Sequence, residues 1–597
     1  MALSRRASTI SNVDGLHAWQ ARRIAAWGRL IVALLIVAML GVLGRVVQLK
    51  LGPDPRMAEA VGTAISSRPE LGRRGDLLDR RGRVIASSTV GYRLFVDPKE
   101  VEDIATIAVD LAAIIGGDPV EMDRLIQPRL HSRYVAVKQL LQPWQVEAIE
   151  RAELRGVGLE PRLVRHYPYG DAAAALVGKV GFEHTGLSGM EHRFNERMLP
   201  EGGHLTYLRD ARRHTLWIEP DGYVPGRDGR RVRLSIDLVI QQIVEEHVRA
   251  AVKRQNAGGG RMVVLDCRTG ELLALFDILN PRAGWDEQTD DPARAIDPAL
   301  GRNRCVTDPY EPGSTFKPFV WSLATELGKA DLEEVLPTPA GPPGHRTGTG
   351  RLIRDAYYYG PSTWRRVLVK SMNAGMAIVA ERMNHRQLRD VLRRFGFGEE
   401  TGCGLPGESP GIVTTAKDWT SYTQCSVAMG HEIAVTPVQM VRAFSAFARD
   451  GTIPTPRLTA VSARDGEYRL IRRAVPESIA LLTRDVMREV MIEGTGRHAQ
   501  SEHYRLFGKS GTAQLPKKEG GGYHEDRYVS SFIAGAPLER PRIVVLCVID
   551  DPDRAKGHYG GAIAGPVVRD VIDATLNYLG VPPDQGREEE ARLVAAR

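Results

Sequence analysis

The sequence predicts an α+β protein with one N-terminal transmembrane helix, a mixed first domain, and a larger domain whose antiparallel sheet is flanked by helices. Three observations lead to this fold class. Hydrophobic residues make up 43% and charged residues 26% of the 597 residues, as in folded proteins. A long apolar segment lies near the N-terminus. Beyond it, strand-like and helix-like runs follow one another without the regular β–α–β alternation of a parallel sheet.

The apolar segment, LIVALLIVAMLGVLG, runs from Leu30 to Gly44 between two arginines. It is shorter than the ~20 residues that span a bilayer. Flanking apolar residues extend it if Arg45 snorkels to the interface, so we predict an anchor over residues 30–49. Arginines outnumber acidic residues in the preceding segment, 1–29, which predicts a cytoplasmic tail and an exported remainder. A cleaved signal peptide is the alternative, but no small-x-small cleavage site lies close behind the segment, which favours an uncleaved anchor.

A scaffold domain is predicted for residues 50–225, which combine short strand-like runs with charged turns and contain no recognisable catalytic set. Within it, RRGDLLDRRGRVIASS at 73–88 indicates a strand, a turn and a second strand, and a helix is expected near 101–115. The charged stretch at 220–231 is rich in glycine and proline, so we place a domain boundary there.

The second domain, residues 226–582, is predicted to begin with a strand and an amphipathic helix. Asp237 or Ser235 is in position to cap that helix. The following segment, RMVVLDCRTGELLALFD, is typical of a β-hairpin, with two apolar strands around a turn. Further expected elements are helices over much of 315–450, a strand near 541–552, a final helix and a loose polar tail at 583–597.

Charge and cysteine usage exclude some classes of protein. The net charge is +7, but it is dispersed and no run mixes basic with aromatic residues, which argues against nucleic-acid binding. The five cysteines lie far apart without a C-x-x-C pair, which argues against a zinc site or a disulfide framework. An odd number leaves at least one thiol free. Cys547, within IVVLCVI, is expected to be a buried strand residue.

The stretch EPGSTFKPF contains the first candidate site. A helix is predicted to start at about Ser314, because the Pro-Gly turn interrupts the chain and Pro318 suits a first turn. Lys317 then shares a helix face with Ser314. A serine is a poor nucleophile unless a base takes its proton. A lysine whose pKa is lowered by burial and by the positive end of a helix can be that base. Taken alone, an N-cap serine beside an exposed lysine is the commoner explanation.

A second motif, KSMNAG, puts Ser371 and Asn373 at the start of a helical run, where a hydroxyl and an amide can project into a cleft. By itself it also fits an ordinary capping segment. The stretch HEIAV at 431–435 is no comparable signal, because it lacks the second histidine of a zinc-protease helix.

The third motif is GKSGTAQ, in which Lys509, Ser510 and Thr512 offer a cation and two hydroxyls. Gly511 lets another backbone approach closely. An edge strand of this kind can bind a peptide through main-chain hydrogen bonds. The letters GKS also end the phosphate-binding P-loop, but His503 stands where that motif needs its first glycine, and no helix pattern follows. Nucleotide binding is therefore not expected.

Together, Ser-x-x-Lys, Ser-x-Asn and Lys-Ser-Gly occur in the order known from penicillin-binding proteins and class A β-lactamases. The chain resembles a class B penicillin-binding protein, a peptidoglycan D,D-transpeptidase, from the anchor to about residue 580. VTPVQMVRAFSAFARDG and GHYGGAIAGPVVRDV also resemble that family's transpeptidase domain. RRGDLLDRRGRVIAS, RHYP and GLSGMEHRF resemble its pedestal, which is sometimes called a dimerisation domain. A short pedestal follows the anchor directly, without a separate glycosyltransferase region, which favours class B over the bifunctional class A.

The resemblance implies a role for each motif residue. Ser314 matches the nucleophile that becomes acylated, and Lys317 matches its proton acceptor. Ser371 would relay protons, and Asn373 would hold the substrate backbone. The residues that match the motif binding the substrate's terminal carboxylate are Lys509, Ser510, Gly511 and Thr512.

The resemblance also implies the reaction. The backbone N–H groups of Ser314 and Thr512 would form the oxyanion hole. Ser510 stands where many relatives have threonine, which keeps the hydroxyl. A D-Ala-D-Ala stem peptide would acylate the serine, and an amine of a neighbouring stem peptide would then form the cross-link. No metal or cofactor is implied. β-Lactams are expected to acylate Ser314 and to stay attached, because no hydrolytic base is evident.

Several alternatives stay open at this point. The short pedestal favours the division (septal) type over the elongation type of transpeptidase. A D,D-carboxypeptidase or a β-lactamase-like serine hydrolase would share the three motifs, although the presence of a pedestal and of a retained anchor argues against it. A membrane sensor and a catalytically silent scaffold are further alternatives. The implied partners, at the inner membrane of a bacterium, are stem peptides, β-lactams as inhibitors, a membrane-embedded glycosyltransferase and division proteins.

Overall fold

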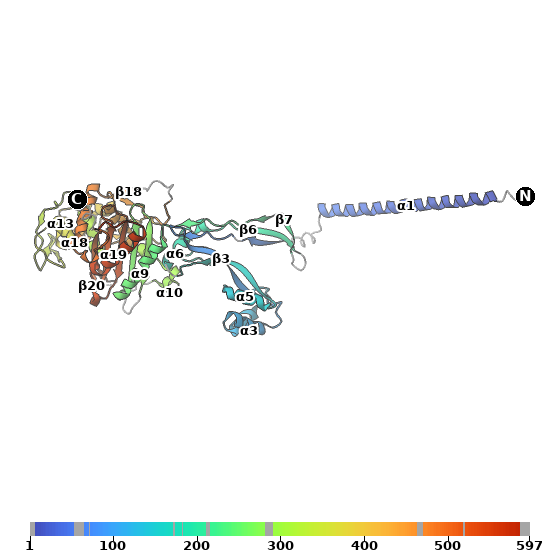
Figure 1. Ribbon diagram of the computed structural model, residues 1–597, viewed down its shortest axis with the longest axis horizontal. Helices are drawn as coiled ribbons and strands as arrows, with labels where there is room; N and C mark the ends of the chain where they lie inside the picture. Colours follow the sequence, from blue (N-terminus) through green and yellow to red (C-terminus); the bar gives the residue numbers. More distant parts are fainter. Residues whose placement is uncertain are drawn as a thin grey trace, which may run out of the picture. The chain divides into compact units, whose positions relative to one another are not determined.

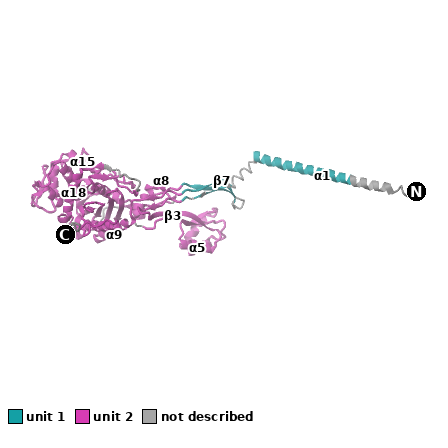
Figure 2. Cartoon of the chain, turned by 45° about the horizontal axis from the view of Figure 1, so that its top comes forward, with its two compact units in different colours: residues 1–72, 201–227 teal, residues 73–200, 228–597 magenta. Residues whose placement is uncertain are grey.

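The computed structural model describes residues 6–52, 65–70, 72–170, 173–181, 183–209, 215–280, 291–461, 470–517 and 520–585. The chain divides into two compact units, residues 1–72 with 201–227 and residues 73–200 with 228–597 (Figure 2). Helices and mainly antiparallel sheets are combined in an α+β fold, as the sequence predicts (Figure 1).

The first unit contains the predicted apolar helix. Helix α1, Arg6–Leu51, includes the segment Trp19–Leu51, which is the one helix among the described residues that is long and apolar enough to cross a membrane. Its 33 residues correspond to about 50 Å, which exceeds the ~30 Å of a bilayer's hydrocarbon core. Its apolar side chains are exposed in the isolated chain, as expected for a helix that lies in lipid. The helix therefore fits a single-pass membrane anchor.

The same unit holds an antiparallel sheet in the order β1-β6-β7. Its strands are β1, Ile65–Glu70; β6, Gly203–Arg209; and β7, Thr215–Val224. Residue Leu208 pairs with Ile65 on one side and with Trp217 on the other. The sheet therefore joins the two ends of the region, 50–225, that is predicted to be one scaffold domain.

In the second unit, the predicted strand–turn–strand of residues 73–88 is confirmed. Strand β2, Leu77–Leu78, pairs antiparallel with β3, Val84–Val96. Strand β3 also pairs with β4, Val135–Lys138, and β5, Val157–His166, while β2 pairs in parallel with β8, Val232–Arg233. The helices of this part are α3, Ile104–Ile115; α4, Pro119–Ile126; η1, Gln127–Arg129; α5, Pro143–Ala152; α6, Ala174–Val177; α7, Gly189–Arg193; and α8, Asn195–Met198.

A five-stranded antiparallel sheet in the order β10-β9-β21-β20-β19 forms the centre of the second unit. Its strands are β9, Gly259–Asp266; β10, Leu272–Leu279; β19, Phe507–Pro516; β20, Tyr523–Ala536; and β21, Ile543–Asp550. The β9–β10 pair confirms the predicted hairpin, and β21 confirms the late strand with a buried Cys547. Strand β19 lies at one edge, so its outer side is free of strand partners within the described residues.

Helices cover both faces of this sheet. Helices α9, Leu238–Arg254, and α19, Gly560–Tyr578, pack on one face, and α17, Pro437–Ala448, packs on the other. Alternate residues of the central strands enter different cores, because successive strand side chains point to opposite faces. Val264 joins the cluster around α9 and α19, whereas Val263 joins the larger cluster around α17. Asp237 caps α9 by accepting a hydrogen bond from the N–H of Val239.

The predicted helical stretch between 315 and 450 is confirmed. Its helices are η4, Gly313–Phe316; α12, Lys317–Glu326; α13, Trp364–Val369; α14, Asn373–Glu381; α15, His385–Phe395; α16, Ser421–Ala428; and α17. The helices not yet named are α10, Pro292–Ile296; η3, Pro298–Leu300; α11, Arg304–Thr307; α18, Glu477–Glu493; η5, Arg497–Ala499; and η6, Arg554–Lys556. Short strands form four two-stranded sheets: β11, Val335–Leu336, with β14, Ser362–Thr363; β12, His345–Arg346, with β13, Leu352–Ile353; β15, Ile412–Val413, with β16, Ile433–Ala434; and β17, Thr452–Pro454, with β18, Leu470–Arg473.

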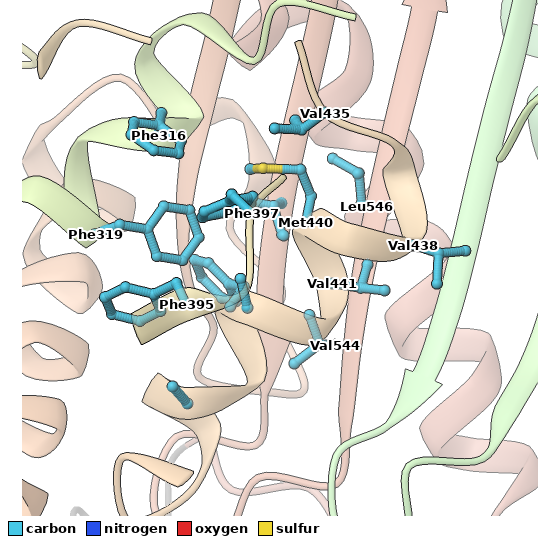
Figure 3. Packing of buried hydrophobic residues seen from close by; sticks show 14 of the residues in the cluster. Phe316, Phe319, Phe395, Phe397, Val435, Val438, Met440, Val441, Val544 and Leu546 are labelled. Carbon is cyan, nitrogen blue, oxygen red and sulfur yellow. The ribbon is translucent and has the colours of Figure 1, made fainter. Parts of the chain in front are cut away.

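An aromatic cluster anchors α12 in the larger core. The ring of Phe319 lies 4.9 Å from that of Phe395 and 5.2 Å from that of Phe397, and Phe316 lies beside them (Figure 3). All four rings are almost fully buried. Edge-to-face and tilted contacts of this kind add to the burial of the rings. The cluster therefore fixes the helix that follows Ser314.

The five cysteines are buried, and none of them is in a disulfide. Of the predicted loose tail, residues 586–597 lie outside the described residues. Just before them, Asp584 is buried and accepts a hydrogen bond of 2.7 Å from the N–H of Arg505.

Candidate active site

The first motif lies where a 3₁₀ turn passes into an α-helix. Ser314 belongs to η4, and Lys317 begins α12, with Pro318 in its first turn, which confirms the predicted helix start. Gly313 has φ 54° and donates from its N–H to the carbonyl of Gly430 over 3.0 Å. A Cβ on Gly430 would lie 2.0 Å from the Gly313 oxygen, so this contact requires glycine there. The loop around residue 430 therefore fixes the turn that carries Ser314.

Lys317 is completely buried and is held by the second motif. Its Nζ donates to the carbonyl oxygen of Ser371 and to Oδ1 of Asn373, both over 2.7 Å, and lies 3.4 Å from Oγ of Ser371. Burial lowers the pKa of Lys317 to about 7, while the carboxylate of Asp355 acts in the opposite direction. A neutral amine has two N–H donors and one lone pair. The two short contacts use the donors, so the lone pair is available to accept a proton.

The second motif is a strained turn at the start of α14. Ser371 has φ 60°, which is unusual for a residue other than glycine. The amide of Asn373 is fully oriented, because its Nδ2 donates to the carbonyl of Arg354 over 2.9 Å while its Oδ1 accepts from Lys317. Backbone strain of this kind is maintained by surrounding contacts and is found at active sites.

The third motif occupies the edge strand β19, as the sequence predicts. Nζ of Lys509 donates to Oγ of Ser371 over 2.8 Å and to the carbonyl of Ser510 over 3.1 Å. Burial lowers the pKa of Lys509 well below its usual value, and the neighbouring Lys317 adds to the lowering. Oγ of Ser510 donates to Oγ1 of Thr495 over 2.7 Å. The hydroxyl of Ser371 is thus placed between two buried lysines.

The fold brings all eight predicted site residues into one region. Lys317, Ser371, Asn373 and Lys509 form one connected set of hydrogen bonds. Ser314 lies one turn before Lys317, and its Oγ makes no hydrogen bond within the described part of the chain. The strand residues Ser510, Gly511 and Thr512 lie against the same turn, since a Cβ on Gly511 would come within 2.6 Å of the carbonyl oxygen of Pro312.

Gly511 is expected to be irreplaceable for reactivity. A Cβ there would lie 2.5 Å from Oγ of Ser531 and 2.6 Å from the Pro312 oxygen, so Gly511→Ala must push β19 away from the Ser314 turn. A shift of about 1 Å between reacting groups can lower a rate by about 100-fold. We expect a loss of that size in the rate of acylation by a fluorescent penicillin. Gly348→Ala, where the nearest atom would be 3.5 Å away, is the control. Wild-type acylation in Gly511→Ala would contradict the required close approach.

Three features of the site have no signal in the sequence. Asp355 accepts hydrogen bonds from the N–H groups of Asn373 and Ala374 at the start of α14. Thr495 binds Ser510, as described above. Glu311 accepts from the hydroxyl of Tyr523 over 2.9 Å and from the N–H of Glu432, and it pairs with His431. Each contact joins residues that are not neighbours in the sequence, so no spacing rule could predict it.

The geometry defines a serine acyl-transfer site in which buried lysines flank the second-motif hydroxyl. The comparisons assign it to a family. The family described as "Penicillin binding protein transpeptidase domain" matches residues 260–573, and "Penicillin-binding Protein dimerisation domain" matches residues 69–234. The chain is 31% identical over 515 residues to the "Probable peptidoglycan D,D-transpeptidase PenA" of Neisseria meningitidis, with 85% of each chain covered.

Two further relatives agree. The chain is 30% identical over 563 residues to "Peptidoglycan D,D-transpeptidase FtsI" of Escherichia coli K12, covering 92% of this chain and 91% of that protein. The crystal structure of penicillin-binding protein 3 from Mycobacterium tuberculosis, complexed with aztreonam, matches with a TM-score of 0.63 and 26% identity, covering 86% of this chain and 98% of that one. The chain belongs to the class B penicillin-binding proteins, the peptidoglycan D,D-transpeptidases.

Proposed function

We propose that this protein cross-links the stem peptides of peptidoglycan through an acyl-enzyme on Ser314 during septal wall synthesis. The observation that carries the proposal is the hydrogen-bonded set of Lys317, Ser371 and Lys509, which links the helix after the Ser314 turn to the edge strand β19. The division role rests on the short pedestal alone, and an elongation-type transpeptidase is the alternative.

The proposed reaction uses these positions in two half-reactions. The D-Ala-D-Ala end of a stem peptide pairs with β19, with its terminal carboxylate near Lys509, Ser510 and Thr512. Neutral Lys317 takes the proton of Ser314 Oγ, which attacks the penultimate carbonyl carbon, and two backbone N–H groups stabilise the oxyanion. The C–N bond to the terminal D-Ala breaks, and the amine leaves with a proton relayed through the Ser371 hydroxyl.

The second half-reaction releases the enzyme. An amine of a neighbouring stem peptide attacks the ester carbonyl, its proton passes to the lysine–serine set, and Ser314 Oγ leaves and regains its proton. A cross-linking amide bond replaces the ester. Asn373, whose amide is fixed by Lys317 and by the Arg354 carbonyl, is the group proposed to hold the substrate backbone.

The domain arrangement is part of the proposal. Residues 1–29 form a cytoplasmic tail and residues 30–49 the membrane anchor. The pedestal, 50–225, carries the transpeptidase domain, 226–582, on the outer side of a bacterial inner membrane. The arginines that precede the apolar segment support this orientation. We propose a membrane-embedded glycosyltransferase and division proteins as partners of the anchor and the pedestal. Purification of the full-length protein from its native membrane without such proteins would count against them.

The test is covalent labelling of the full-length protein in detergent with a fluorescent penicillin, beside Ser314→Ala. The matched control is Ser322→Ala, because Ser322 is buried in α12, the helix that follows the Ser314 turn, and its hydroxyl donates to the Phe319 carbonyl. We expect an adduct that persists for hours in the wild type and in Ser322→Ala, and none in Ser314→Ala. An adduct that clears within seconds would instead identify a D,D-carboxypeptidase or β-lactamase-like hydrolase. If the folded wild-type protein formed no adduct, the catalytic assignment would be refuted, and a catalytically silent scaffold would be the remaining alternative.

A further inference from the structure

Asp355 is a buried carboxylate that contacts the backbone of the second motif. It follows the short strand β13 and is 9% exposed. Its Oδ1 accepts hydrogen bonds from the N–H of Asn373 and, over 3.2 Å, from the N–H of Ala374. These N–H groups open α14 and have no acceptor within the helix. The N-cap residue of the helix, Met372, makes no side-chain hydrogen bond to them. Asp355 thus caps this helix from a distant part of the chain.

Helix capping alone does not explain the residue at this position. Oδ2 of Asp355 is buried and has no hydrogen-bond partner among the described residues. An unpaired oxygen of a buried carboxylate is costly, and a serine hydroxyl is a capping group that carries no second oxygen. Unsatisfied polar groups in native proteins call for an explanation, and a functional charge is one. The negative charge of Asp355 is therefore the feature that needs a role.

Lys317 gives this charge a role. Asp355 binds the backbone N–H of Asn373, and the side chain of Asn373 binds Nζ of Lys317. The carboxylate of Asp355 acts on Lys317 and favours the protonated form of its amine. Lys509 shares the Ser371 hydroxyl with Lys317, and burial together with the neighbouring Lys317 lowers the pKa of Lys509. The Asn373 turn links this carboxylate to the buried amine, so its charge affects how readily Lys317 accepts a proton.

We propose that Asp355 is a positioning residue that holds the Ser371–Asn373 turn against Lys317 and whose charge sets the pH at which Lys317 accepts the Ser314 proton. The inference rests on the proposed acyl-transfer function and adds a residue to it. Asp355 has two proposed roles, as a hydrogen-bond acceptor and as a charge. A different substitution tests each role.

Asp355→Asn keeps an oxygen that can accept from both N–H groups, but it removes the charge. With the charge gone, the pKa of Lys317 falls, so the acidic limb of the acylation rate must move to lower pH. The experiment measures the second-order rate constant for acylation of full-length protein by benzylpenicillin between pH 5.5 and 9. We expect a shift of the acidic limb by about one pH unit. Its position is a readout that a merely structural residue would not change.

Asp355→Ala removes the acceptor as well as the charge. The start of α14 then loses its cap, Asn373 is no longer fixed, and the plateau rate should fall by about 10- to 100-fold. Asp103→Asn is the matched control, because Asp103 caps α3 through the Ala105 N–H, far from the site in the sequence. It should leave both the plateau and the pH profile unchanged.

The outcomes are distinct. An unchanged pH profile in Asp355→Asn would overturn the charge role, even if the variant is less stable. A wild-type plateau in Asp355→Ala would overturn the positioning role. Asp355→Asn is nearly isosteric, so the pH test stands if Asp355→Ala fails to fold. A folded wild type that forms no penicillin adduct would instead refute the proposed function itself, before any variant is compared.

Discussion

Lys317→Met is expected to lower the rate of acylation by penicillin by about 1,000-fold, because the variant has no group that can take the Ser314 proton. A positioned general base contributes about 10²- to 10⁴-fold. Methionine has a similar unbranched shape and suits a fully buried position, so the fold should persist. The measurement is the second-order acylation rate constant of the full-length protein at pH 8. Lys329→Met, just beyond the end of the same helix, should react like the wild type.

The pH dependence of the wild type follows from the same residue. Below its pKa of about 7, Lys317 is protonated and has no lone pair, so acylation must fall as the pH decreases through that value. Above it, the amine is neutral and the rate must reach a plateau. In Lys317→Met this acidic limb should disappear, and only a slow, nearly pH-independent reaction should remain. If the acylation rate of the wild type instead fell around pH ~10.4, the ordinary pKa of lysine, Lys317 would be charged at neutral pH.

The parts of the site that the sequence predicted are those that depend on local spacing. Lys317 follows Ser314 by three positions, which is about one helical turn, and Pro318 marks where the helix begins. The two apolar runs on either side of a short turn predicted the β9–β10 hairpin for the same reason. Such relations are determined by backbone geometry over a few residues, so they can be read without knowing the rest of the fold.

The parts that the sequence could not predict depend on contacts between distant segments. Asp355 meets the start of α14 across 18 residues, and Glu311 meets His431 across 120. Strand β9 pairs with β21, as in Leu265 opposite Val544, although hundreds of residues separate them. Likewise, β6 and β7 pair with β1 rather than with the strands around β3, so the predicted scaffold region is divided between two compact units. Residue types and spacings contain no information on such pairings.

The largest expected effect on stability is that of Phe319→Ala. The ring is fully buried and contacts the rings of Phe316, Phe395, Phe397 and Phe447. Removing a buried phenylalanine side chain costs about 3–5 kcal/mol, because apolar burial is lost and a cavity is left. For a domain of this size we expect the midpoint of thermal inactivation to fall by about 10 °C. The measurement is residual penicillin acylation after heating the full-length protein in detergent.

Two variants separate this effect from general damage. Phe319→Leu keeps most of the side-chain volume, so its midpoint of thermal inactivation should fall by less than half as much as that of Phe319→Ala. Tyr357→Ala removes an aromatic ring that is 65% exposed and should change the midpoint little. Because Phe319 lies two residues after Lys317 on α12, the cavity variant should also acylate more slowly at temperatures where it is still folded. A full acylation rate together with a lowered midpoint would show that the aromatic cluster stabilises the domain without positioning Ser314 and Lys317.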